Sequence, residues 1–456
     1  MFRNSKKMHF VGIGGIGMSG IAEILINMGY DVSGSDLRES EQTRHLEEMG
    51  ARIFIGHYPS NIYDYNVVVT SSAINNSNPE IIEAKNRMIP IIHRSEMLAE
   101  LMRLKHGIGV SGTHGKTTTS SMLAYTLFHG GVNPTAVIGG KVLNFGSNAR
   151  SGAGDYIVFE ADESDGSFLK LFPSIAIVTN IDADHLDHYK YFNNVKEAFL
   201  EYINKVPFYG YSVLCIDDVT IRELLPRVER SFITYGFSED ADFRASDVRL
   251  ENGRMKYTCS YKGKDLGTFD IVSLGNHNVL NSLSVIAVAL DLGLPVKAIA
   301  EGLAEFKGVG RRFEHIGESA GVLVIDDYGH HPTEIRATLA ALAQFGRRLV
   351  VIFQPHRYTR TELLWDEFGQ AFGHAGRLFL SEIYPAGEQP IEGISSALIR
   401  ESVMKHDGPI VDVIERFEDI PARVCAEIKE GDIVVTLGAG DIYKAASLIL
   451  EELGKR

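Results

Sequence analysis

The sequence contains little cysteine and little tryptophan. It has three cysteines and one tryptophan in 456 residues. Cys215, Cys259 and Cys425 lie far apart in the sequence, so they predict neither a disulfide framework nor a metal site of short ligand spacing. Such a sparse, odd-numbered set favours a reducing compartment, and we expect a cytoplasmic protein.

An excess of positive charge and a long apolar run are also missing. The formal net charge is −14, which argues against a broad electrostatic surface for nucleic acid or anionic lipid. An apolar run of roughly 18 residues, long enough to span a bilayer, does not occur. The stretch 8–28 is fairly apolar like a signal peptide, but five glycines interrupt it, and a strand, a turn and a helix explain them better. We therefore expect no nucleic acid as a partner and no membrane span.

Short apolar runs alternate with amphipathic stretches along almost the whole chain, which predicts βαβ units around parallel sheets. The length suggests about three domains. Turn signals at 251–253 and 262–264 predict antiparallel hairpins within 242–273. The segment Gly308–Arg312 resembles a linker. Strands are expected at 9–13, 31–35, 53–55, 67–70, 108–111, 156–160, 175–179, 212–216, 322–326, 349–353, 378–381 and 433–437.

The strongest motif is the glycine-rich segment Gly109–Thr119, which follows an apolar strand and opens a helix. Glycines allow backbone N–H groups to surround phosphate oxygens, and the helix N-terminus adds partial positive charge. Lys116 is expected to reach the β- and γ-phosphates, and Thr117 to hold Mg²⁺. The standard phosphate loop has its first glycine where this chain has Val110. An ordinary glycine turn is the alternative, but Gly115-Lys116-Thr117 between a strand and a helix favours phosphate binding.

A second motif, Gly12-Ile-Gly14-Gly15-Ile-Gly17, matches a dinucleotide fingerprint, with Asp36 about 20 residues further on. This pattern indicates a nucleotide or a diphosphate at a helix N-terminus and does not prove NAD. A packing turn without a ligand is the alternative.

Two acidic segments follow expected strands in the unit that carries Lys116. Glu160–Asp165 contains four carboxylates, which suit a hard cation shared with phosphates, although a solvated acidic loop is equally common. Thr179–His188 contains His185, which could ligate a metal or orient a carboxylate. The alternative there is a polar helix start capped by Asp182 or Asp184.

The third unit carries Asp326–Pro332 and Gln354–Arg360, both at expected strand ends, where open α/β sheets bind ligands. Arg357 and Arg360 could clamp a carboxylate bidentately. Surface ion pairing is the alternative, and His356 beside both arginines favours a site.

Together these motifs closely resemble the Mur ligases of peptidoglycan precursor synthesis. Val110 agrees with this resemblance, because the loop of that family is typically G-x-x-G-T-x-G-K-[ST]. The resemblance covers essentially the whole chain and rests, in order, on Gly12–Gly20, Gly109–Thr119, Glu160–Phe168, Thr179–His188, Gly275–Asn281, Asp326–Glu334 and Gln354–Thr361.

The resemblance implies an α/β fold of three domains. These are a Rossmann-like domain for the UDP-sugar at 1–106, a central P-loop domain for ATP at 107–318, and a Rossmann-like C-terminal domain at 319–456. The central domain would combine a parallel sheet with a small antiparallel sheet. The last domain would bind the amino acid and close over the site, with Gly308–Arg312 as the hinge.

The resemblance also implies the activity: ATP-dependent, ADP-forming ligation of L-alanine to the carboxylate of UDP-N-acetylmuramate, through an acyl phosphate and with Mg²⁺ or Mn²⁺. Its catalytic residues would be Lys116, Glu160, His185 and His330, and its metal ligands Thr117, Glu160 and His185. ATP would contact Gly112, Thr113, His114, Gly115, Lys116, Thr117, Thr118, Asn278, Asn281 and Arg312. The UDP-sugar would contact Gly14, Gly15, Ile16, Gly17, Asp36 and Ser71. The amino acid and carboxylate would contact Tyr328, His330, His356, Arg357 and Arg360.

Other functions remain open at this stage. Within the family, a ligase that attaches a recycled tripeptide to the same nucleotide sugar is the nearest alternative. Those ligases tend to carry Tyr where this chain has Ser164 and to lack the form of Gly14–Gly20, which favours alanine here. A nicotinamide-dependent dehydrogenase leaves the Lys116 loop unexplained, and a non-catalytic nucleotide sensor predicts binding without turnover. The oligomeric state is expected to be a monomer or a homodimer.

Overall fold

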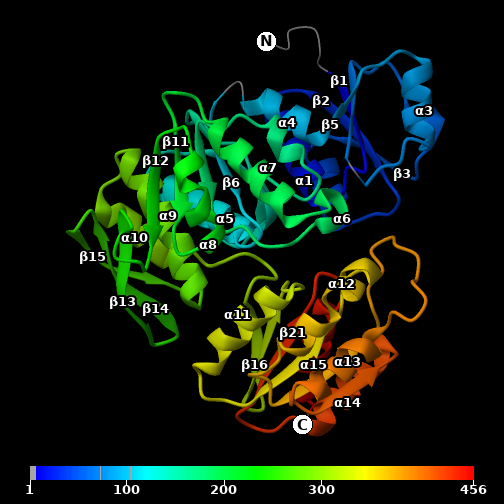
Figure 1. Ribbon diagram of the computed structural model, residues 1–456. Helices are drawn as coiled ribbons and strands as arrows, with labels where there is room; N and C mark the ends of the chain where they lie inside the picture. The colour runs from blue at the N-terminus through cyan, green and yellow to red at the C-terminus, as the bar shows by residue number, and fades with distance from the viewer. Residues whose placement is uncertain (1–6, 72, 103–104, 456) are drawn as a thin grey trace. The chain divides into compact units, whose positions relative to one another are not determined.

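The computed structural model describes residues 7–71, 73–102 and 105–455. Residues 1–6, which the expected first domain includes, lie outside this range. The contacts divide the chain into two compact units, of which the first takes most of the chain up to Lys307 and the second most of the chain from Gly308 onward. The three sheets of Figure 1 comprise two in the first unit and one in the second.

The amino-terminal sheet has five parallel strands in the order β3-β2-β1-β4-β5. Its strands are β1 (Lys7–Val11), β2 (Asp31–Asp36), β3 (Arg52–Ile55), β4 (Val67–Thr70) and β5 (Ile91–His93). Its helices are α1 (Ile16–Asn27), α2 (Glu41–Glu48), α3 (Pro79–Asn86) and α4 (Arg94–Met102). The strand expected at 9–13 ends at Val11, because Gly12 has φ of +80° and leaves the extended conformation. The direction in which successive strands are added to the sheet reverses at β1, and ligands of open α/β sheets bind at such switch points.

The central sheet has ten strands in the order β15-β14-β13-β12-β11-β10-β6-β9-β7-β8. They are β6 (His106–Ser111), β7 (Thr135–Val142), β8 (Ser147–Arg150), β9 (Tyr156–Glu160), β10 (Ile175–Val178), β11 (Tyr211–Cys215), β12 (Phe232–Gly236), β13 (Phe243–Glu251), β14 (Arg254–Tyr261) and β15 (Lys264–Ile271). Its helices are α5 (Lys116–His129), α6 (Leu186–Tyr189), α7 (Phe192–Asn204), α8 (Val219–Leu224), α9 (Asn276–Asp291) and α10 (Val296–Glu305).

The hairpins expected within 242–273 are present. Two-residue loops, 252–253 and 262–263, join β13, β14 and β15, and both residues of each loop have positive φ. That conformation belongs to the tight turns whose twist matches antiparallel strands. These strands extend the central sheet beyond β12 and do not form a sheet of their own.

The third sheet, in the second unit, has the order β16-β17-β21-β18-β19-β20. Its strands are β16 (Glu314–Ser319), β17 (Val322–Asp327), β18 (Leu349–Phe353), β19 (Arg377–Ser381), β20 (Val411–Ile414) and β21 (Ile433–Leu437). Its helices are α11 (Pro332–Ala343), α12 (Tyr358–Gly369), α13 (Ser396–Lys405), α14 (Ile420–Glu427) and α15 (Tyr443–Leu453). One buried cluster packs α11, α12 and α13 on one face, and a second packs α14 and α15 on the other. The edge strand β16, antiparallel to β17, was not expected from the sequence.

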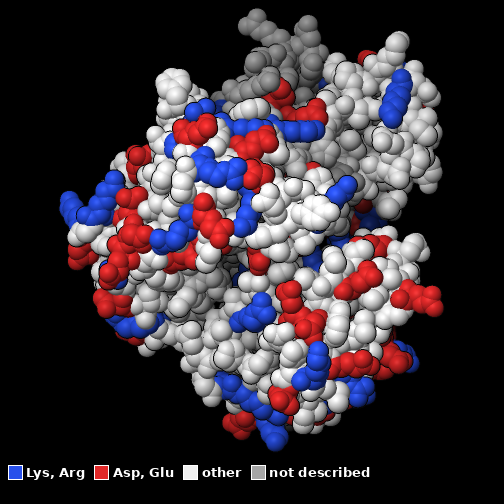
Figure 2. Space-filling view, in the orientation of Figure 1, with Lys and Arg blue, Asp and Glu red and all other residues white. Residues whose placement is uncertain are grey.

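Short 3-10 helices occur at η1 (Pro59–Asn61), η2 (Ser167–Lys170), η3 (Leu225–Arg227) and η4 (Phe417–Asp419). Cys215, Cys259 and Cys425 are all buried, and none of the three forms a disulfide within the described part of the chain. Within the described ranges, no helix combines the length and the apolarity needed to cross a membrane. Figure 2 shows acidic and basic side chains interspersed over the displayed face.

Candidate functional site

The phosphate loop runs from the end of β6 to the start of α5, and two of its glycines have positive φ. Gly112 has φ of +132°, and a Cβ there would lie 2.1 Å from Oγ1 of Thr179. Gly115 has φ of +84°, and a Cβ there would lie 2.9 Å from the side-chain oxygen of Asn281. Only glycine fits either position. Val110 is fully buried within β6, so the position where the standard motif has glycine belongs here to the strand.

Lys116 is held inside this loop. Its ammonium donates to the carbonyl oxygens of Gly112 at 2.6 Å and Thr113 at 3.1 Å, and to Oε1 of Glu163 at 2.8 Å. Burial opposes the charged form, but the carboxylates of Glu163, Asp162 and Glu160 outweigh it and raise the pKa of Lys116. The lysine therefore stays cationic where a triphosphate would lie.

Glu163 is the counter-charge of this lysine and is itself almost inaccessible. Burial raises the pKa of Glu163 to about 7, although the nearby ammonium of Lys116 opposes the rise. Its second oxygen, Oε2, is buried and has no hydrogen-bond partner among the described residues. The sequence placed Glu163 in an acidic cluster but did not distinguish it from the other three carboxylates. Its position after β9, opposite Lys116, is a relationship that only the fold reveals.

Oxygen atoms gather beside the first turn of α5. The hydroxyl of Thr117 donates to Oε2 of Glu160 at 3.0 Å, and the hydroxyl of Ser120 donates to Oε1 at 3.3 Å. The backbone N–H of Gly139, on β7, also donates to Oε1 at 2.5 Å. A hydroxyl and a carboxylate adjacent to a triphosphate loop are ligands that Mg²⁺ accepts. The residues present therefore fit the expected divalent ion.

His185 lies beside the carboxylates of Glu163 and Asp184 and directly precedes α6, with a left-handed φ of +57°. Its Nε2 is 3.8 Å from Oε1 of Glu163 and 3.7 Å from Oδ2 of Asp184. A non-glycine residue in this conformation marks a local constraint that is common at functional sites. The fold thus places His185 beside Glu163, which is hydrogen-bonded to Lys116. It also places Thr117 beside Glu160.

The segment after β10 shapes the phosphate loop, a role that the sequence did not reveal. Oδ1 of Asn180 accepts from the backbone N–H of His114 at 2.8 Å, and its amide donates to the carbonyl of His114 at 3.0 Å. The hydroxyl of Thr179 donates to the same carbonyl at 2.6 Å. The backbone N–H of Asp182 donates to Oγ1 of Thr113 at 2.8 Å. Asn278 and Asn281, expected to contact ATP, are both buried and hydrogen-bonded to each other at 3.1 Å.

The glycine turn of the amino-terminal sheet is tied to Asp36. The backbone N–H of Gly14 donates to Oδ2 of Asp36 at 2.9 Å. The acidic residue of the fingerprint therefore holds the turn itself. Ser71 follows β4, at the same carboxyl edge of the sheet. Arg94 packs over Gly17, since a Cβ there would lie 2.2 Å from one guanidinium nitrogen, and Arg94 was not expected from the sequence.

In the second unit, Tyr328, His330 and His356 form one aromatic cluster. The rings of Tyr328 and His330 are 5.4 Å apart, and those of His330 and His356 are 5.8 Å apart. Tyr384 stacks on His356 at 5.6 Å. Burial lowers the pKa of His330 to about 3 and that of His356 to about 4. Both imidazoles are therefore neutral at physiological pH.

Arg357 and Arg360 lie beside this cluster. Nη1 of Arg360 donates to Nδ1 of His356 at 3.5 Å. Arg357 has φ of +72°, and its buried Nε has no hydrogen-bond partner within the described part of the chain. A strained backbone and an unsatisfied buried donor are both costly. Their coincidence in one arginine suits an anion that supplies the missing acceptor.

Arg312 lies in the second unit with Tyr328 and Glu334. Its guanidinium is 4.9 Å above the ring of Tyr328, and 3.5 Å separates it from Oε1 of Glu334. Its neighbour Arg311 also covers that ring at 4.9 Å and pairs with Asp326 at 3.4 Å. Arg312, which was expected to contact ATP, thus lies within the second unit beside Tyr328, a residue expected to contact the amino acid.

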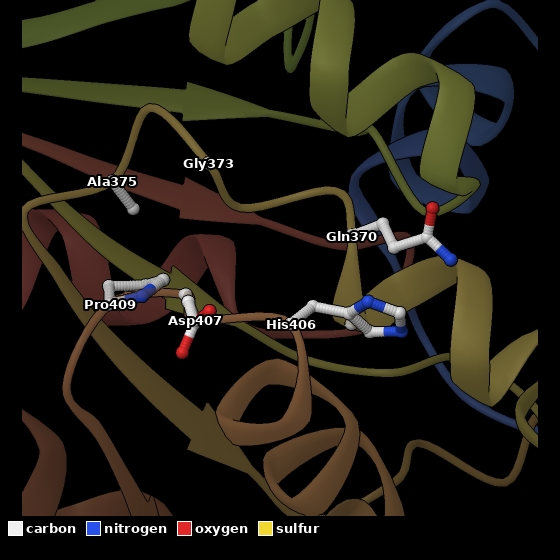
Figure 3. Close-up of a pocket in the computed structure, with 8 residues that line it drawn as sticks. Gln370, Gly373, Ala375, His406, Asp407 and Pro409 are labelled. Atoms are coloured by element: carbon white, nitrogen blue, oxygen red, sulfur yellow. The ribbon is translucent and has the colours of Figure 1, made fainter.

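A separate hollow of about 230 Å³ lies in the second unit (Figure 3). It follows the C-terminal ends of α12 and α13, whereas Arg357 and Arg360 lie at the N-terminal end of α12. The hollow is therefore at the opposite edge of the sheet and contains none of the expected site residues. Its lining residues are Gly369, Gln370, Gly373, Ala375, His406, Asp407, Gly408 and Pro409.

Comparisons with known proteins match the chain to one family along most of its length. Residues 7–106 match the Mur ligase family catalytic domain, residues 110–289 the Mur ligase middle domain, and residues 311–440 the Mur ligase glutamate ligase domain.

Individual relatives match over nearly the full length. The UDP-N-acetylmuramate–L-alanine ligase of Trichlorobacter lovleyi is 54% identical over 99% of this chain and 100% of that protein. The protein of the same name from Geobacter sulfurreducens is 54% identical over 99% of both. Among solved structures, UDP-N-acetylmuramate-alanine ligase from Thermotoga maritima has a TM-score of 0.84 at 31% identity, with 98% of this chain and 99% of that chain covered. A murein peptide ligase from Psychrobacter arcticus has a TM-score of 0.73 at 25% identity, with 99% of both chains covered.

Proposed function

The chain belongs to the Mur ligase family, and we propose that it is an ATP-dependent ligase that joins L-alanine to the carboxylate of UDP-N-acetylmuramate in peptidoglycan precursor synthesis. The observation that carries this proposal is the full-length identity of 54% to two proteins that bear this activity in their names. The higher TM-score with the alanine ligase than with the murein peptide ligase, 0.84 against 0.73, favours alanine over a tripeptide.

The chemical problem is that a carboxylate is a poor electrophile. An oxygen of the muramyl carboxylate attacks the γ-phosphorus of ATP, and ADP leaves, so that an acyl phosphate forms. The alanine nitrogen then attacks the acyl carbon and loses a proton, and inorganic phosphate leaves with the electron pair of the broken C–O bond. These steps need positioning and charge neutralisation, and no protein nucleophile.

The loop at the start of α5 supplies both. Backbone N–H groups within Gly112–Thr118 bind the triphosphate, other than those of Thr113 and His114, which donate to Asn180. Lys116 neutralises charge on the transferring phosphoryl group. Glu163 holds the ammonium of Lys116 at the loop, at 2.8 Å. Thr117, Glu160 and His185 would hold Mg²⁺, or Mn²⁺, which supplies further neutralisation of phosphate charge when it is bound. Asn278, Asn281 and Arg312 complete the proposed ATP contacts.

The nucleotide sugar binds at the switch point of the amino-terminal sheet. The backbone N–H groups of Ile16 and Gly17 bind the diphosphate at the N-terminus of α1. Gly15, whose N–H donates to the carbonyl of Gly12 at 3.2 Å, lines the site, and Asp36 holds the turn through Gly14. Ser71 adds a hydroxyl at the same edge of the sheet. The sparse, buried cysteines fit a reducing, cytoplasmic setting for this reaction.

Carboxylate recognition belongs to the second unit. Arg357 and Arg360 bind carboxylates, and the rings of Tyr328 and His356 line the pocket for the amino acid. His330 orients the alanine amine. With its pKa at about 3, this imidazole accepts a hydrogen bond at neutral pH but is too weak a base to deprotonate an ammonium group.

The test is phosphate release by the purified protein with ATP, Mg²⁺ and UDP-N-acetylmuramate, and a panel of L-alanine, L-serine, glycine and the murein tripeptide. Release that requires both UDP-N-acetylmuramate and L-alanine is expected. Faster phosphate release with the tripeptide than with L-alanine would indicate instead the ligase that attaches a recycled tripeptide. Nucleotide binding without phosphate release would indicate a non-catalytic nucleotide sensor. A change in NADH fluorescence on mixing with the protein would favour a dehydrogenase.

A further inference from the structure

One edge hairpin of the central sheet reaches both phosphate sites of the first unit. This hairpin consists of β7 and β8, which pair antiparallel through Ala136–Arg150, Val137–Ala149 and Val142–Ser147. It lies at the β8 edge of the ten-stranded sheet. We refer to it below as the edge hairpin.

In the middle of β7, the edge hairpin touches the carboxylate beside the triphosphate loop. The backbone N–H of Gly139 donates to Oε1 of Glu160 at 2.5 Å. A side chain at this position has no room, because a Cβ would lie 2.6 Å from Oε2 of the same carboxylate. Glu160 in turn accepts from Thr117, in the first turn of α5. The backbone of β7 is thereby fixed to the triphosphate site.

Through β8, the edge hairpin packs along one face of α1. The side-chain amide of Asn148 donates to the carbonyl of Ile16, in the first helical turn, at 2.6 Å. The hydroxyl of Ser147 donates to Oε2 of Glu23 at 3.0 Å. Between these contacts lies Gly20, where a Cβ would be 3.2 Å from Cβ of Ala149. Positions 16, 20 and 23 fall on one face of a helix.

These contacts join the two phosphate sites through a single short element. Ile16 directly follows the glycine turn, so a bond to its carbonyl constrains the direction of the N–H groups that face the diphosphate. Phosphoryl transfer is sensitive to the spacing of donor and acceptor, and a displacement of roughly 1 Å can cost about a hundredfold in rate. A device that holds the glycine turn at a set distance from the triphosphate loop would therefore serve this reaction.

We propose that the edge hairpin sets the position of the glycine turn of α1 relative to the triphosphate loop, and that Asn148 is the positioning residue of this contact. The inference rests on the proposed function for its substrates. Asn148 acts through the backbone of α1, so its loss affects the nucleotide sugar selectively and leaves ATP binding in place.

The test is a steady-state comparison of Asn148→Ala and Asn148→Leu with the wild-type protein. Leucine has nearly the shape of asparagine but no donor. Both variants are expected to raise KM for UDP-N-acetylmuramate about tenfold, with KM for ATP unchanged and Tm within about 2 °C. Lys141→Met is the matched control, because it removes only the exposed ion pair of the same hairpin with Glu41, and its kinetics are expected to equal those of the wild type.

A second pair of variants tests the packing independently. Gly20→Ala introduces a better helix former but crowds Ala149, so KM for the nucleotide sugar is expected to rise although the helix is not weakened. Adding Ala149→Gly removes the closer of the two tight contacts, the other being Nδ2 of Asn148 at 3.3 Å, and is expected to lower KM again toward the wild-type value. A purely structural role predicts the reverse: parallel changes in both KM values and in Tm, without rescue.

Hydrogen exchange gives a readout that does not depend on turnover. In ligand-free Asn148→Ala, exchange is expected to accelerate in the first turn of α1 and to remain unchanged in α9. Unchanged exchange in α1, unchanged KM for the nucleotide sugar, or a failed rescue would overturn the inference. A wild-type protein without ligase turnover would instead contradict the proposed function, and exchange would still decide the role of Asn148.

Discussion

The ammonium of Lys116 lies 2.8 Å from Oε1 of Glu163, with 15% of the lysine side chain and 2% of the glutamate side chain exposed. This pair sits where the triphosphate would bind. We expect Lys116→Ala to reduce ligase turnover by at least about a thousandfold, because charge on the transferring phosphoryl group is no longer offset. Far-UV circular dichroism should show an intact fold. Substantial ligation by this variant would contradict the proposed phosphate site.

Glu163 predicts a specific pH dependence of stability. Its pKa is raised to about 7 in the folded chain, so the folded state keeps a proton that the unfolded state loses near pH 4.5. The contribution of this group to stability is therefore largest below pH 4.5 and is lost as the pH rises through 7. Relative to the wild type, Glu163→Gln should gain stability between pH 5 and pH 8. Denaturant unfolding at several pH values measures this, and parallel curves would refute the assignment.

His330 predicts the opposite trend in acid. Burial lowers the pKa of His330 to about 3 in the folded chain. As the pH falls through 6.5, the unfolded chain therefore binds a proton that the folded chain does not bind. The stability that His330 contributes is present above pH 6.5 and is lost as the pH falls toward 3. His330→Gln should remove this part of the acid sensitivity. In turnover, His330→Gln should keep more activity than His330→Ala, because an amide oxygen can still accept from the amine.

Arg357 predicts a conflict between stability and activity. Its φ of +72° suits glycine, and its buried Nε has no partner among the described residues. Arg357→Gly should raise the free energy of unfolding by up to about 1 kcal/mol, since both costs disappear. The same change should abolish ligation, because a carboxylate ligand is lost. Arg336→Gly, on the partly exposed α11, serves as the control for a generic arginine deletion. A lower free energy of unfolding in Arg357→Gly than in the wild type would contradict the inference that the backbone of Arg357 is strained.

Asp36 predicts selective loss of nucleotide-sugar binding. Its carboxylate accepts from the backbone N–H of Gly14 at 2.9 Å, and Asp36→Ala leaves that group of the glycine turn without its acceptor. Calorimetry should show UDP-N-acetylmuramate binding weakened by about tenfold or more, with ATP binding nearly unchanged. Equal losses for both nucleotides would exclude the amino-terminal sheet from the UDP role.

Strands bounded by turn residues could be predicted from the sequence. The expected strands 67–70, 156–160, 349–353 and 433–437 agree with β4, β9, β18 and β21 residue by residue. Three of these apolar runs have polar residues or glycine beyond both ends, and the fourth, β9, follows Asp155 and ends in Glu160. The edge strand β16 could not be predicted, because Glu314–Ser319 is largely polar and contains Gly317. Its extended form depends on pairing with β17.

The phosphate loop could likewise be predicted, because its glycines, lysine and threonine are adjacent in sequence. The sequence could not show which carboxylates contact this loop. Four carboxylates in Glu160–Asp165 are equivalent until folding buries Glu163 against Lys116 and turns Glu160 to Thr117. The contact of Asn148 with Ile16 joins segments 132 residues apart, and neither segment carries a local signal of it. The roles of the individual site residues stay predictions until variants are measured.

The buried thiols have a practical consequence. Burial raises the pKa of Cys215 and Cys259 to about 12. The thiolate is the form that attacks a maleimide, so these native sulfurs should react slowly with maleimide dyes. Cysteines introduced at Phe208 in the first unit and at Met404 in the second, which are 90% and 62% exposed, could then be labelled without removing any native thiol. Energy transfer between the two dyes would report how far apart the units stand as each substrate is added.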